Sequence, residues 1–529
     1  MEHITRQTES RTESRSKLKK VGLNVLKNGL KLFAAFNISA LVSAVNTSVF
    51  LTMYSCDREA TDEIDFPHEG EKFKIADLTL REKIAQLLHG SAYDSKMGDS
   101  IDRVVNHRKV PLPINFSDWL TDGLKSDENI GGVHIFRSDA RTLEETQRSM
   151  REIMAKSKIP PFTSMDIVGG YTRHIGLTYE DAHKFGVPLR FILLAKAHNI
   201  ELPSQEDLGR LFESLKTDKE KIAFRLDMEA YGAAIAKLCR HSGITVDFGP
   251  VMDLVEDKDG VNFMEKNDET YSDKIYTVMV LAFHFQKGFQ SQNGVLLVPK
   301  HFAGTGKMDV NPHELVDQTL SGMKRKSGEL LPFKDAIMGS LFSDPISRSD
   351  YPLDNLFIDA RSKGSSAKLE PYDFGVDVSN FTTMNPVDGI MVGHALSFMD
   401  LNTPGTLSTD VIQHRLRDKL GFDGVVWTDD LSMGAIQNYS QKDGFNNSGV
   451  LFQNAFMAGA TMPMLLHNSG DLDQIVAAVE VAIEKGEMSM EDVDARVQQV
   501  LELKVKIGLL TKTSDGHYVN RAKDYLSEK

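Results

Sequence analysis

The sequence predicts an α/β fold: a TIM (β/α)8-type barrel with two insertions and an N-terminal hydrophobic helix. Short apolar segments of strand-type composition alternate with longer helical segments over residues 75–511. This alternation is typical of βαβ units in a parallel sheet, and roughly seven or eight such units close a barrel. The chain of 529 residues is long for one domain, but insertions between the units account for the excess.

Along the chain, the expected elements begin with a helical pattern at Leu78. The predicted strands are residues 131–136, 161–166, 244–249, 295–299, 389–393, 424–428 and 460–466, and the clearest predicted helices between them are 219–242 and 273–290. Residues 495–510 have the periodicity of an amphipathic helix that packs outside a barrel. The charged, helix-rich residues 177–218 and the Ser-, Pro- and Asp-rich residues 340–384 are predicted insertions.

The segments before the barrel have a different composition. Residues 1–31 carry eight Lys/Arg against three Glu, and residues 32–55 contain no charged side chain. A stretch of about 20 apolar residues is enough to span a bilayer. We therefore expect a membrane anchor or signal segment at 32–56, with residues 1–31 in the cytoplasm and the barrel on the exported, periplasmic side of the cell envelope.

Alternatives remain open for this segment. Cys56 has the position of a lipoprotein cysteine, so an uncleaved anchor and a lipidated mature protein both fit the sequence. Asn37 and Asn46 lower the apolarity, which also fits an amphipathic or buried helix of a soluble protein. Residues 57–74 are expected to form a polar linker, and residues 512–529 a C-terminal tail.

Composition excludes several classes of function. The formal net charge of −14 argues against a nucleic-acid partner, because phosphate binding needs a basic face. The two cysteines, Cys56 and Cys239, are too few for a disulfide framework or a four-thiolate zinc site. His301, Asp309 and His313 lack the spacing of a metal motif. We therefore expect neither a metal nor a cofactor.

The most informative segment is the predicted strand at residues 424–428, which ends abruptly on Asp429 and Asp430. A continuous apolar run is typical of a buried parallel strand. An acid at the carboxyl end of such a strand lies where α/β enzymes carry out their chemistry. The alternative is that the two carboxylates only cap the next helix.

A second segment with candidate catalytic and binding side chains is residues 298–315, VPKHFAGTGKMDVNPHEL. A predicted strand ends in Lys300 and His301, and a glycine-containing loop then leads to His313. Glycine allows close approach of the backbone and loop motion. This segment therefore brings an amine and two imidazoles toward the same end of the barrel as Asp429.

Together these segments resemble the signatures of glycoside hydrolase family 3, and the Asp-Leu-Ser-Met at 430–433 is most similar to its β-N-acetylglucosaminidase branch. The resemblance covers residues 75–511 and includes the strands at 131–136, 244–254 and 389–408. It implies that Asp429 is the nucleophile and His313 the acid/base. It also implies that Lys300, His301 and Asp166 bind sugar hydroxyls.

Several positions depart from the family pattern. The Asp that orients the acid/base is replaced by Asn311, and Asp309 is a candidate substitute from the same loop. An Asn holds geometry but supplies no charge to raise the basicity of an imidazole. Val168 and Tyr171 replace a Glu and an Arg of a sugar-binding motif, and Glu269 replaces a further Arg.

The function that the resemblance implies is a retaining β-glycosidase that hydrolyses β-N-acetylglucosaminides of peptidoglycan. Its partners would be cell-wall glycan or its fragments, and the membrane through residues 32–56. The departures leave two alternatives open. One is a catalytically impaired barrel that binds cell-wall glycan, since a fold does not guarantee activity. The other is a β-glucosidase-like hydrolase.

Overall fold

The computed structural model describes residues 64–91, 130–136, 142–170, 172–173, 177–254, 269–304, 331–338, 340–341, 382–383, 385–397, 400, 402–443, 447–466 and 472–527. The predicted basic segment 1–31 and hydrophobic segment 32–56 lie outside these residues. Within the described ranges, no helix combines the length and the apolarity that a membrane span requires. The predicted N-terminal hydrophobic helix therefore stays a prediction.

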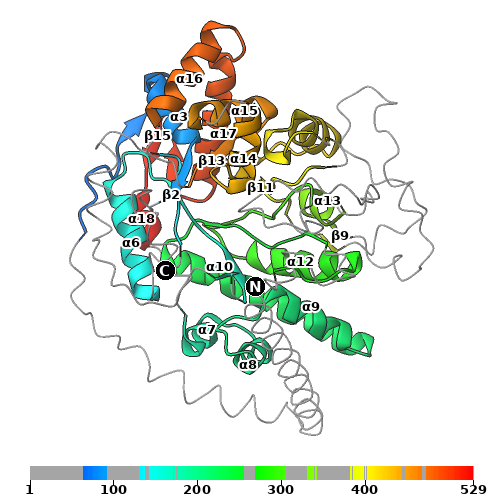
Figure 1. Ribbon diagram of the computed structural model, residues 1–529. Helices are drawn as coiled ribbons and strands as arrows, with labels where there is room; N and C mark the ends of the chain where they lie inside the picture. Colours follow the sequence, from blue (N-terminus) through cyan, green and yellow to red (C-terminus); the bar gives the residue numbers. More distant parts are fainter. Residues whose placement is uncertain are drawn as a thin grey trace, which may run out of the picture.

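The centre of the molecule is an eight-stranded parallel sheet in the order β11-β12-β13-β2-β3-β4-β7-β8 (Figure 1). Its strands are β2 (His89–Ser91), β3 (Gly132–His134), β4 (Phe162–Met165), β7 (Val246–Asp247), β8 (Leu296–Leu297), β11 (Gly389–Val392), β12 (Val425–Asp430) and β13 (Met462–Met464). The two end strands meet beyond β8, where the N–H of Phe302 donates to the carbonyl of Met391 (2.8 Å) and the N–H of Met391 donates to Pro299 (3.0 Å). The predicted TIM-type barrel is confirmed.

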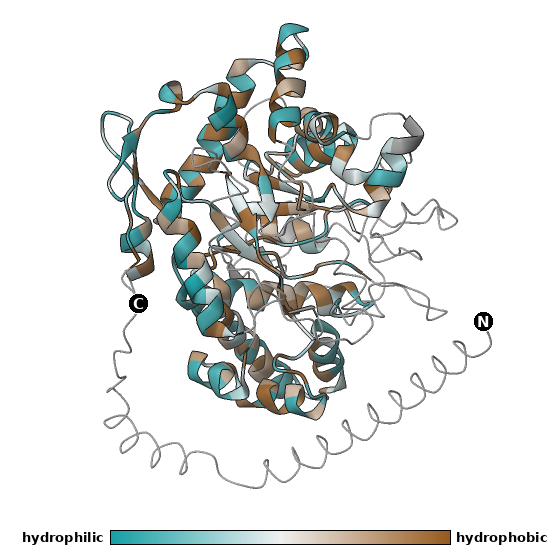
Figure 2. Ribbon diagram, turned by 60° about the vertical axis from the view of Figure 1, so that its left-hand side comes forward, coloured by the Kyte–Doolittle hydropathy of each residue, from teal (hydrophilic) through white to brown (hydrophobic). Residues whose placement is uncertain are grey.

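Helices surround the barrel and follow its strands along the chain. They are α3 (Leu80–Leu87), α6 (Leu143–Lys156), α10 (Asp218–Ser242), α12 (Ile275–Phe289), α13 (Leu331–Met338), η9 (Asp410–Lys419), α14 (Gly434–Asp443), α15 (Ser448–Ala458), α16 (Leu472–Glu484) and α17 (Met490–Lys506). Figure 2 shows hydrophobic and hydrophilic residues mixed along these helices, as expected where only one face packs on the sheet. Thr217 begins α10 with a capping box to Glu220, and Gly243 ends it with a positive φ of 76°.

The barrel interior combines aromatic packing with a buried hydrogen-bond chain. The Trp427 ring packs edge-on against Phe162 and Phe248. Its indole N–H donates to Nδ1 of His89 (3.2 Å), and Nε2 of His89 lies 2.8 Å from the hydroxyl of Ser164. Since Nδ1 accepts the hydrogen bond from the indole N–H, the proton of the neutral His89 ring lies on Nε2. Burial lowers the pKa of His89 well below its ordinary value, so the imidazole stays neutral.

The strand β2 is one that the sequence analysis missed. It has three residues and follows α3 after a single connecting residue, Leu88. Its segment reads as the end of the preceding helical pattern, because three residues are too few to show a strand period. The pairing of β2 with both β13 and β3 nevertheless makes it a full member of the barrel.

The ends of the barrel region differ from their expected boundaries. β1 (Lys72–Phe73), β15 (Tyr518–Asn520) and β14 (Leu510–Lys512) form a three-stranded antiparallel sheet, and α18 (Ala522–Ser527) follows. The expected boundary at residue 511 therefore falls inside β14. The side chain of Asn520 donates to the carbonyls of Ser157 (3.1 Å) and Lys158 (2.9 Å). Residues 512–527 are thus part of the folded domain, and β1 extends it into the expected linker.

The insertion at residues 177–218 forms three helices: α7 (Tyr179–Phe185), α8 (Leu189–Ala197) and α9 (Gln205–Ser214). The amide of Gln205 donates to the carbonyl of Val251 (2.8 Å) and accepts from its N–H (2.9 Å). A Cβ at Gly209 would lie 1.7 Å from the carbonyl oxygen of Tyr271. The insertion therefore supports the segments that follow β7. Of the second insertion, 340–384, the structure describes only the paired strands β9 (Ser340–Leu341) and β10 (Thr382–Thr383).

One cation is buried where α17 meets the barrel. The ammonium of Lys504 donates to the side-chain oxygen of Gln86 (2.7 Å) and lies 5.2 Å from the centre of the Phe162 ring. Burial lowers the pKa of Lys504 from 10.5 to about 7. Between pH 7 and pH 10 the unfolded chain therefore binds more protons at this position than the folded chain. The stability contributed by this residue rises with pH across that interval.

We predict that Lys504→Met raises the melting temperature at pH 7, because an apolar side chain of similar length removes the cost of burying a charge. The variant should also lose part of the rise in stability between pH 7 and pH 10. Calorimetry at three pH values measures both effects. A lower melting temperature with an unchanged pH dependence would contradict this prediction. It would show that the contacts of the ammonium with Gln86 and Phe162 offset the cost of burying its charge.

Candidate active site

Charged and polar side chains gather where the barrel strands end. β12 ends with Asp429 and Asp430, β7 ends with Asp247, and Asp166 directly follows β4. Lys300 and His301 follow β8, and His394 follows β11. Because all the strands are parallel, these carboxyl ends lie at one mouth of the barrel. Asp166, Lys300, His301 and Asp429 were expected from the sequence, whereas the roles of Asp247 and His394 were not.

The two adjacent carboxylates at the end of β12 have different surroundings. Oδ1 of Asp430 accepts hydrogen bonds from the N–H of Ser432 (2.9 Å), the hydroxyl of Ser432 (2.6 Å) and the N–H of Leu466 (2.9 Å). These bonds fix the turn before α14, which is the structural role that the helix-cap alternative assigned to the pair. Asp429 accepts one local bond, from the N–H of Asp430 (2.8 Å). The structural role that the capping alternative gave to both carboxylates is thus filled by Asp430.

The charge state of Asp429 suits a nucleophile. Burial raises the pKa of the Asp429 carboxyl, but two neighbouring imidazoles, the N–H of Asp430 and the ammonium of Lys300 outweigh it and lower the pKa below its ordinary value. The group is therefore an anion at neutral pH, as a carboxylate that attacks a carbon atom must be.

Lys300 and Asp166 form an ion pair inside the site. The ammonium lies 2.9 Å from Oδ1 of Asp166, and the Lys300 side chain is only 7% exposed. Burial lowers the pKa of Lys300, but Asp166, with help from Glu269 and Asp429, more than reverses this effect and raises the pKa. The pair thus places an ammonium donor beside a carboxylate acceptor.

His301 is paired in the same way with an acid from another strand end. Its Nδ1 lies 2.9 Å from Oδ2 of Asp253, and its backbone N–H donates to the same oxygen (3.1 Å). Burial lowers the pKa of His301, but Asp253 outweighs burial and raises it. Since a carboxylate only accepts, Nδ1 carries a proton. Asp253 lies in the 244–254 segment that supported the fold prediction, but nothing in its spacing identified it as the partner of His301.

Asp247 is a buried acid of the site with only one of its two carboxyl oxygens hydrogen-bonded among the described residues. Its Oδ1 accepts from the N–H of Ile167 (3.0 Å), while its buried Oδ2 has no hydrogen-bond partner among the described residues. Burial raises the pKa of Asp247 to about 7; Asp166 adds to this shift, while the Ile167 N–H and Lys300 oppose it. The sequence analysis placed Asp247 inside a strand, where its acidity gave no sign of a site.

His394 connects the end of β12 to the segment after β11. Its Nε2 lies 2.9 Å from the carbonyl oxygen of Asp430, and its Nδ1 lies 2.9 Å from the hydroxyl of Thr406. Because a carbonyl only accepts, the proton lies on Nε2, and Thr406 donates to Nδ1. Burial lowers the pKa of His394, and Asp429 and Asp430 oppose this shift only in part. A neutral imidazole of fixed tautomer therefore holds the end of β12.

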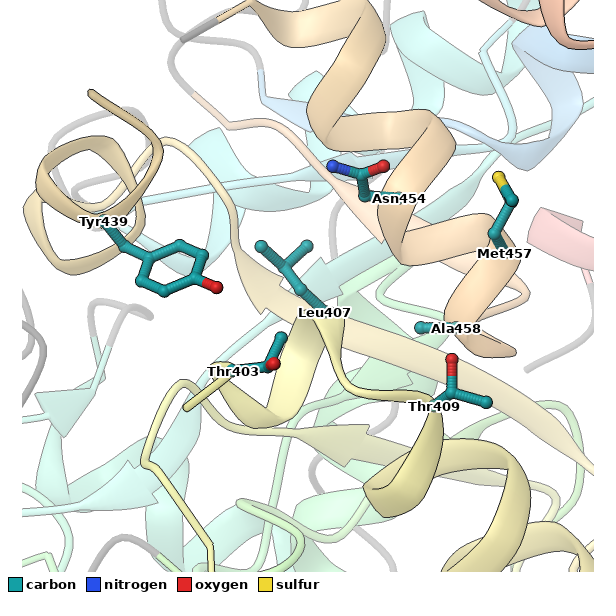
Figure 3. Close-up of a pocket in the computed structure, with 7 residues that line it drawn as sticks. All are labelled: Thr403, Leu407, Thr409, Tyr439, Asn454, Met457 and Ala458. Carbon is teal, nitrogen blue, oxygen red and sulfur yellow. The ribbon is translucent and has the colours of Figure 1, made fainter. Parts of the chain in front are cut away.

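A separate hollow of about 330 Å³ lies between η8 (Gly405–Leu407), η9, α14 and α15 (Figure 3). It is lined by Thr403, Leu407, Thr409, Tyr439, Asn454, Met457 and Ala458. Figure 3 shows Tyr439 approaching from one side and the three α15 residues from the other. None of these residues belongs to the charged cluster at the strand ends. The hollow therefore borders the loop that carries Thr406 and is distinct from the candidate active site.

Three of the predicted functional residues cannot be placed. His313, Asp309 and Asn311 lie outside the described residues, so the acid/base assignment stays a prediction. Among the departures from the family pattern, Val168 is buried in β5 (Ile167–Gly169). Glu269 interacts electrostatically with Lys300. In the part of the chain that the structure describes, no group of three or more His, Cys, Asp or Glu side chains is arranged to hold a metal ion.

The raised pKa of Asp247 predicts a specific pH dependence of stability. Between about pH 4 and pH 7 the folded chain keeps a proton on Asp247 that the unfolded chain loses, so stability falls as pH rises through this interval. Asp247→Asn keeps the acceptor for the Ile167 N–H and cannot ionise. We expect the melting temperature of the variant to fall less than that of the parent between pH 5 and pH 8. Equal slopes would show that Asp247 is already ionised at pH 5.

Comparison with known sequences agrees with this geometry. The sequence pattern of the glycosyl hydrolase family 3 N-terminal domain matches residues 201–343 and 366–503, together more than half of the chain. β-Hexosaminidase A of Pseudoalteromonas piscicida is 26% identical over 289 residues, which cover 52% of this chain and 40% of that protein. β-Hexosaminidase LpqI of Mycobacterium tuberculosis is 28% identical over 272 residues, 50% of this chain and 55% of that protein. The matched regions thus span about half the length of these relatives.

Solved structures support the same fold. The family 3 β-N-acetylglucosaminidase of Paenibacillus sp. FPU-7 superposes with a TM-score of 0.53 and 22% identity, over 81% of this chain and 63% of that one. The structure of M. tuberculosis LpqI gives a TM-score of 0.52 and 21% identity, over 82% of this chain and 97% of that one. At these identities the superpositions establish the barrel alone. With the extent of the sequence match, they show that this chain belongs to glycosyl hydrolase family 3.

Proposed function

We propose that this chain is a retaining β-glycosidase that hydrolyses β-N-acetylglucosaminides, with Asp429 as its nucleophile. The observation that carries the proposal is the ionised Asp429 at the carboxyl end of β12, beside the Lys300–Asp166 pair. The names of the sequence relatives, β-hexosaminidases, support the choice of sugar. Family membership supports the reaction class, since the family consists of glycosyl hydrolases by description.

The reaction would proceed in two displacements. In the first, a carboxylate oxygen of Asp429 forms a bond to the anomeric carbon while the bond to the leaving oxygen breaks, and a general acid protonates that oxygen. In the second, water attacks the same carbon, its proton passes to the now basic group, and the bond to Asp429 breaks. We assign the acid/base role to His313 on the basis of the family resemblance.

The two ion pairs would hold the sugar. The ammonium of Lys300 donates and the carboxylate of Asp166 accepts, so together they match neighbouring hydroxyl groups, each of which is both donor and acceptor. His301, oriented by Asp253, adds a further polar group at the adjacent strand end. Because each cation is already balanced by an acid, the site can bind a neutral sugar without leaving a buried charge unpaired.

The setting that we propose for this activity is the cell envelope. The basic residues 1–31 and the uncharged residues 32–55 support a membrane anchor or signal segment with the barrel on the periplasmic side. The substrate there would be peptidoglycan or its fragments, because peptidoglycan presents β-linked N-acetylglucosamine beside the membrane.

Two departures from the family pattern favour a second candidate function. Glu269 interacts with Lys300 at a position where the family pattern has an Arg, and Asn311 stands where that pattern has an Asp. The first change reverses a positive charge of the family's sugar-binding pattern, and the second removes the negative charge that orients its acid/base. The alternative that they favour is a barrel that binds cell-wall glycan with impaired catalysis; a β-glucosidase-like hydrolase would share Asp429 but not the preference for the acetamido sugar.

The adjacent carboxylates provide a matched pair of test variants. We predict that the full chain hydrolyses 4-nitrophenyl β-N-acetylglucosaminide and that Asp429→Asn lowers kcat/KM by more than about 10³-fold, because the nucleophile is lost. Asp430→Asn keeps an oxygen for Ser432 and Leu466 and should retain most of the activity. Release of 4-nitrophenol at constant pH measures both.

Three other outcomes would change the conclusion. Equal losses in the two variants would indicate structural damage rather than a lost nucleophile. A folded parent protein that turns over neither this substrate nor the matching β-glucoside would contradict the hydrolase proposal and favour the glycan-binding barrel. Turnover of the β-glucoside alone would favour the β-glucosidase-like alternative.

A further inference from the structure

The insertion and the helix that follows it expose an unusual amount of apolar surface. Among the described residues, six large apolar side chains are strongly exposed, and four of them lie on α8 and the first half of α10. They are Leu189 (56% exposed), Leu193 (47%), Ile222 (55%) and Leu226 (61%). We refer to these four residues as the α8/α10 patch. Scattered single exposures are normal, but a group on neighbouring elements marks an interaction surface.

The spacing shows that each pair forms one stripe. Leu189 and Leu193, like Ile222 and Leu226, are four residues apart, which places them on the same helix face. The core-facing side of each helix has its own apolar residues, such as the fully buried Phe191 and Phe224. Each helix is therefore apolar on two sides, and the packing of the domain uses only one of them.

Side-chain contacts connect the two helices that carry the stripes. The guanidinium of Arg190 on α8 lies 2.9 Å from the carboxylate of Asp227 on α10 and 5.5 Å from the centre of the Phe224 ring. The rings of Phe191 and Phe224 lie 5.2 Å apart. Figure 1 shows α7 and α8 at the margin of the molecule, next to α10 and away from the β13 side of the barrel. The two exposed stripes are therefore carried by helices that contact each other through Arg190, Phe191, Phe224 and Asp227.

The residues around the patch are basic, whereas the chain as a whole is acidic. Residues 189–197 and 216–227 contain six Lys/Arg against three Asp/Glu, whereas the whole chain contains 61 against 75. Lys196 and Lys219 are exposed beside the stripes. An apolar stripe bordered by cations is the pattern of helices that lie in the headgroup region of an anionic bilayer.

We propose that the α8/α10 patch is a membrane-contact surface that rests on anionic lipid headgroups. The uncharged residues 32–55 support this occupant, because a segment inserted there would be followed by only 16 residues before Lys72 of β1. At roughly 3.5 Å per residue, such a linker keeps the barrel within about 60 Å of the bilayer. A second copy of the chain is a poorer occupant, since a symmetric contact would bring like charges together.

The contact would orient the active site. α9 follows α8 directly, and its Gln205 holds the backbone of Val251 in the segment after β7. That segment also carries Asp253, the partner of His301. A bilayer that fixes α8 and α10 therefore fixes the direction in which the mouth of the barrel faces. This inference goes beyond the proposed hydrolysis and does not depend on it.

Fluorescent labelling of the full chain in vesicles tests the proposal. An environment-sensitive fluorophore is attached in turn at Leu193→Cys and Leu226→Cys, in a Cys56→Ser background, since Cys239 is buried. Met457→Cys and Val481→Cys serve as matched controls, because these side chains are exposed to 45% and 46% but lie outside the patch. The vesicles contain phosphatidylglycerol and phosphatidylethanolamine, with and without brominated lipid.

We expect a blue shift and quenching by brominated lipid at positions 193 and 226, and neither effect at 457 and 481. The double charge variant Lys196→Glu/Lys219→Glu should reduce quenching at both patch positions several-fold. Similar quenching at all four positions, or none at 193 and 226, would overturn the proposal. A blue shift that appears in detergent without vesicles and grows with protein concentration would overturn it in favour of self-association.

Discussion

Closure of a parallel barrel is the constraint on which the site depends. Backbone hydrogen bonds from Met391 and Phe302 join the segment that follows β8 to β11 and close the ring of eight parallel strands. Because every strand ends at the same mouth, residues far apart in sequence, such as Asp166 and Asp429, share one electrostatic environment with Lys300. The buried network of His89, Trp427 and Ser164 fills the interior below it, and its neutral tautomer avoids placing a charge in the core.

Within this mouth, each buried cation has its own acid. Asp166 balances Lys300, and Asp253 balances His301. The field of the neighbouring imidazoles and of the Lys300 ammonium then keeps Asp429 ionised. This division suits a nucleophile that must face a developing positive charge on a sugar ring. Asp247 is kept partly protonated by burial, which limits the accumulation of negative charge beside Asp166. His394 then fixes the main chain next to Asp429 through its hydrogen bond to the carbonyl of Asp430.

The sequence predicted the position of a residue correctly where a local pattern determines that position. Asp429, Lys300, His301 and Asp166 each follow an apolar run, and a parallel strand sends such residues to the mouth of the barrel. It failed where the information is non-local. Asp247 and Asp253 act through burial and through partners on other strands, which no spacing reveals. β2 is too short to show a period, and residues 512–527 have no strand pattern of their own because their sheet depends on pairing with β1. The exposure of the α8 and α10 stripes likewise required knowing which helix faces pack inward.

The central claim, that Asp429 becomes covalently bonded to the sugar, can be tested directly by trapping the intermediate. A 2-deoxy-2-fluoro-β-glucoside with a good leaving group is a suitable reagent, because the fluorine slows the second displacement and leaves the glycosyl-enzyme in place. Peptide mapping by mass spectrometry should find one added sugar on the peptide that contains Asp429 and Asp430, and fragmentation should locate it on Asp429. An adduct on another carboxylate, or leaving-group release with inversion and no adduct, would contradict the account.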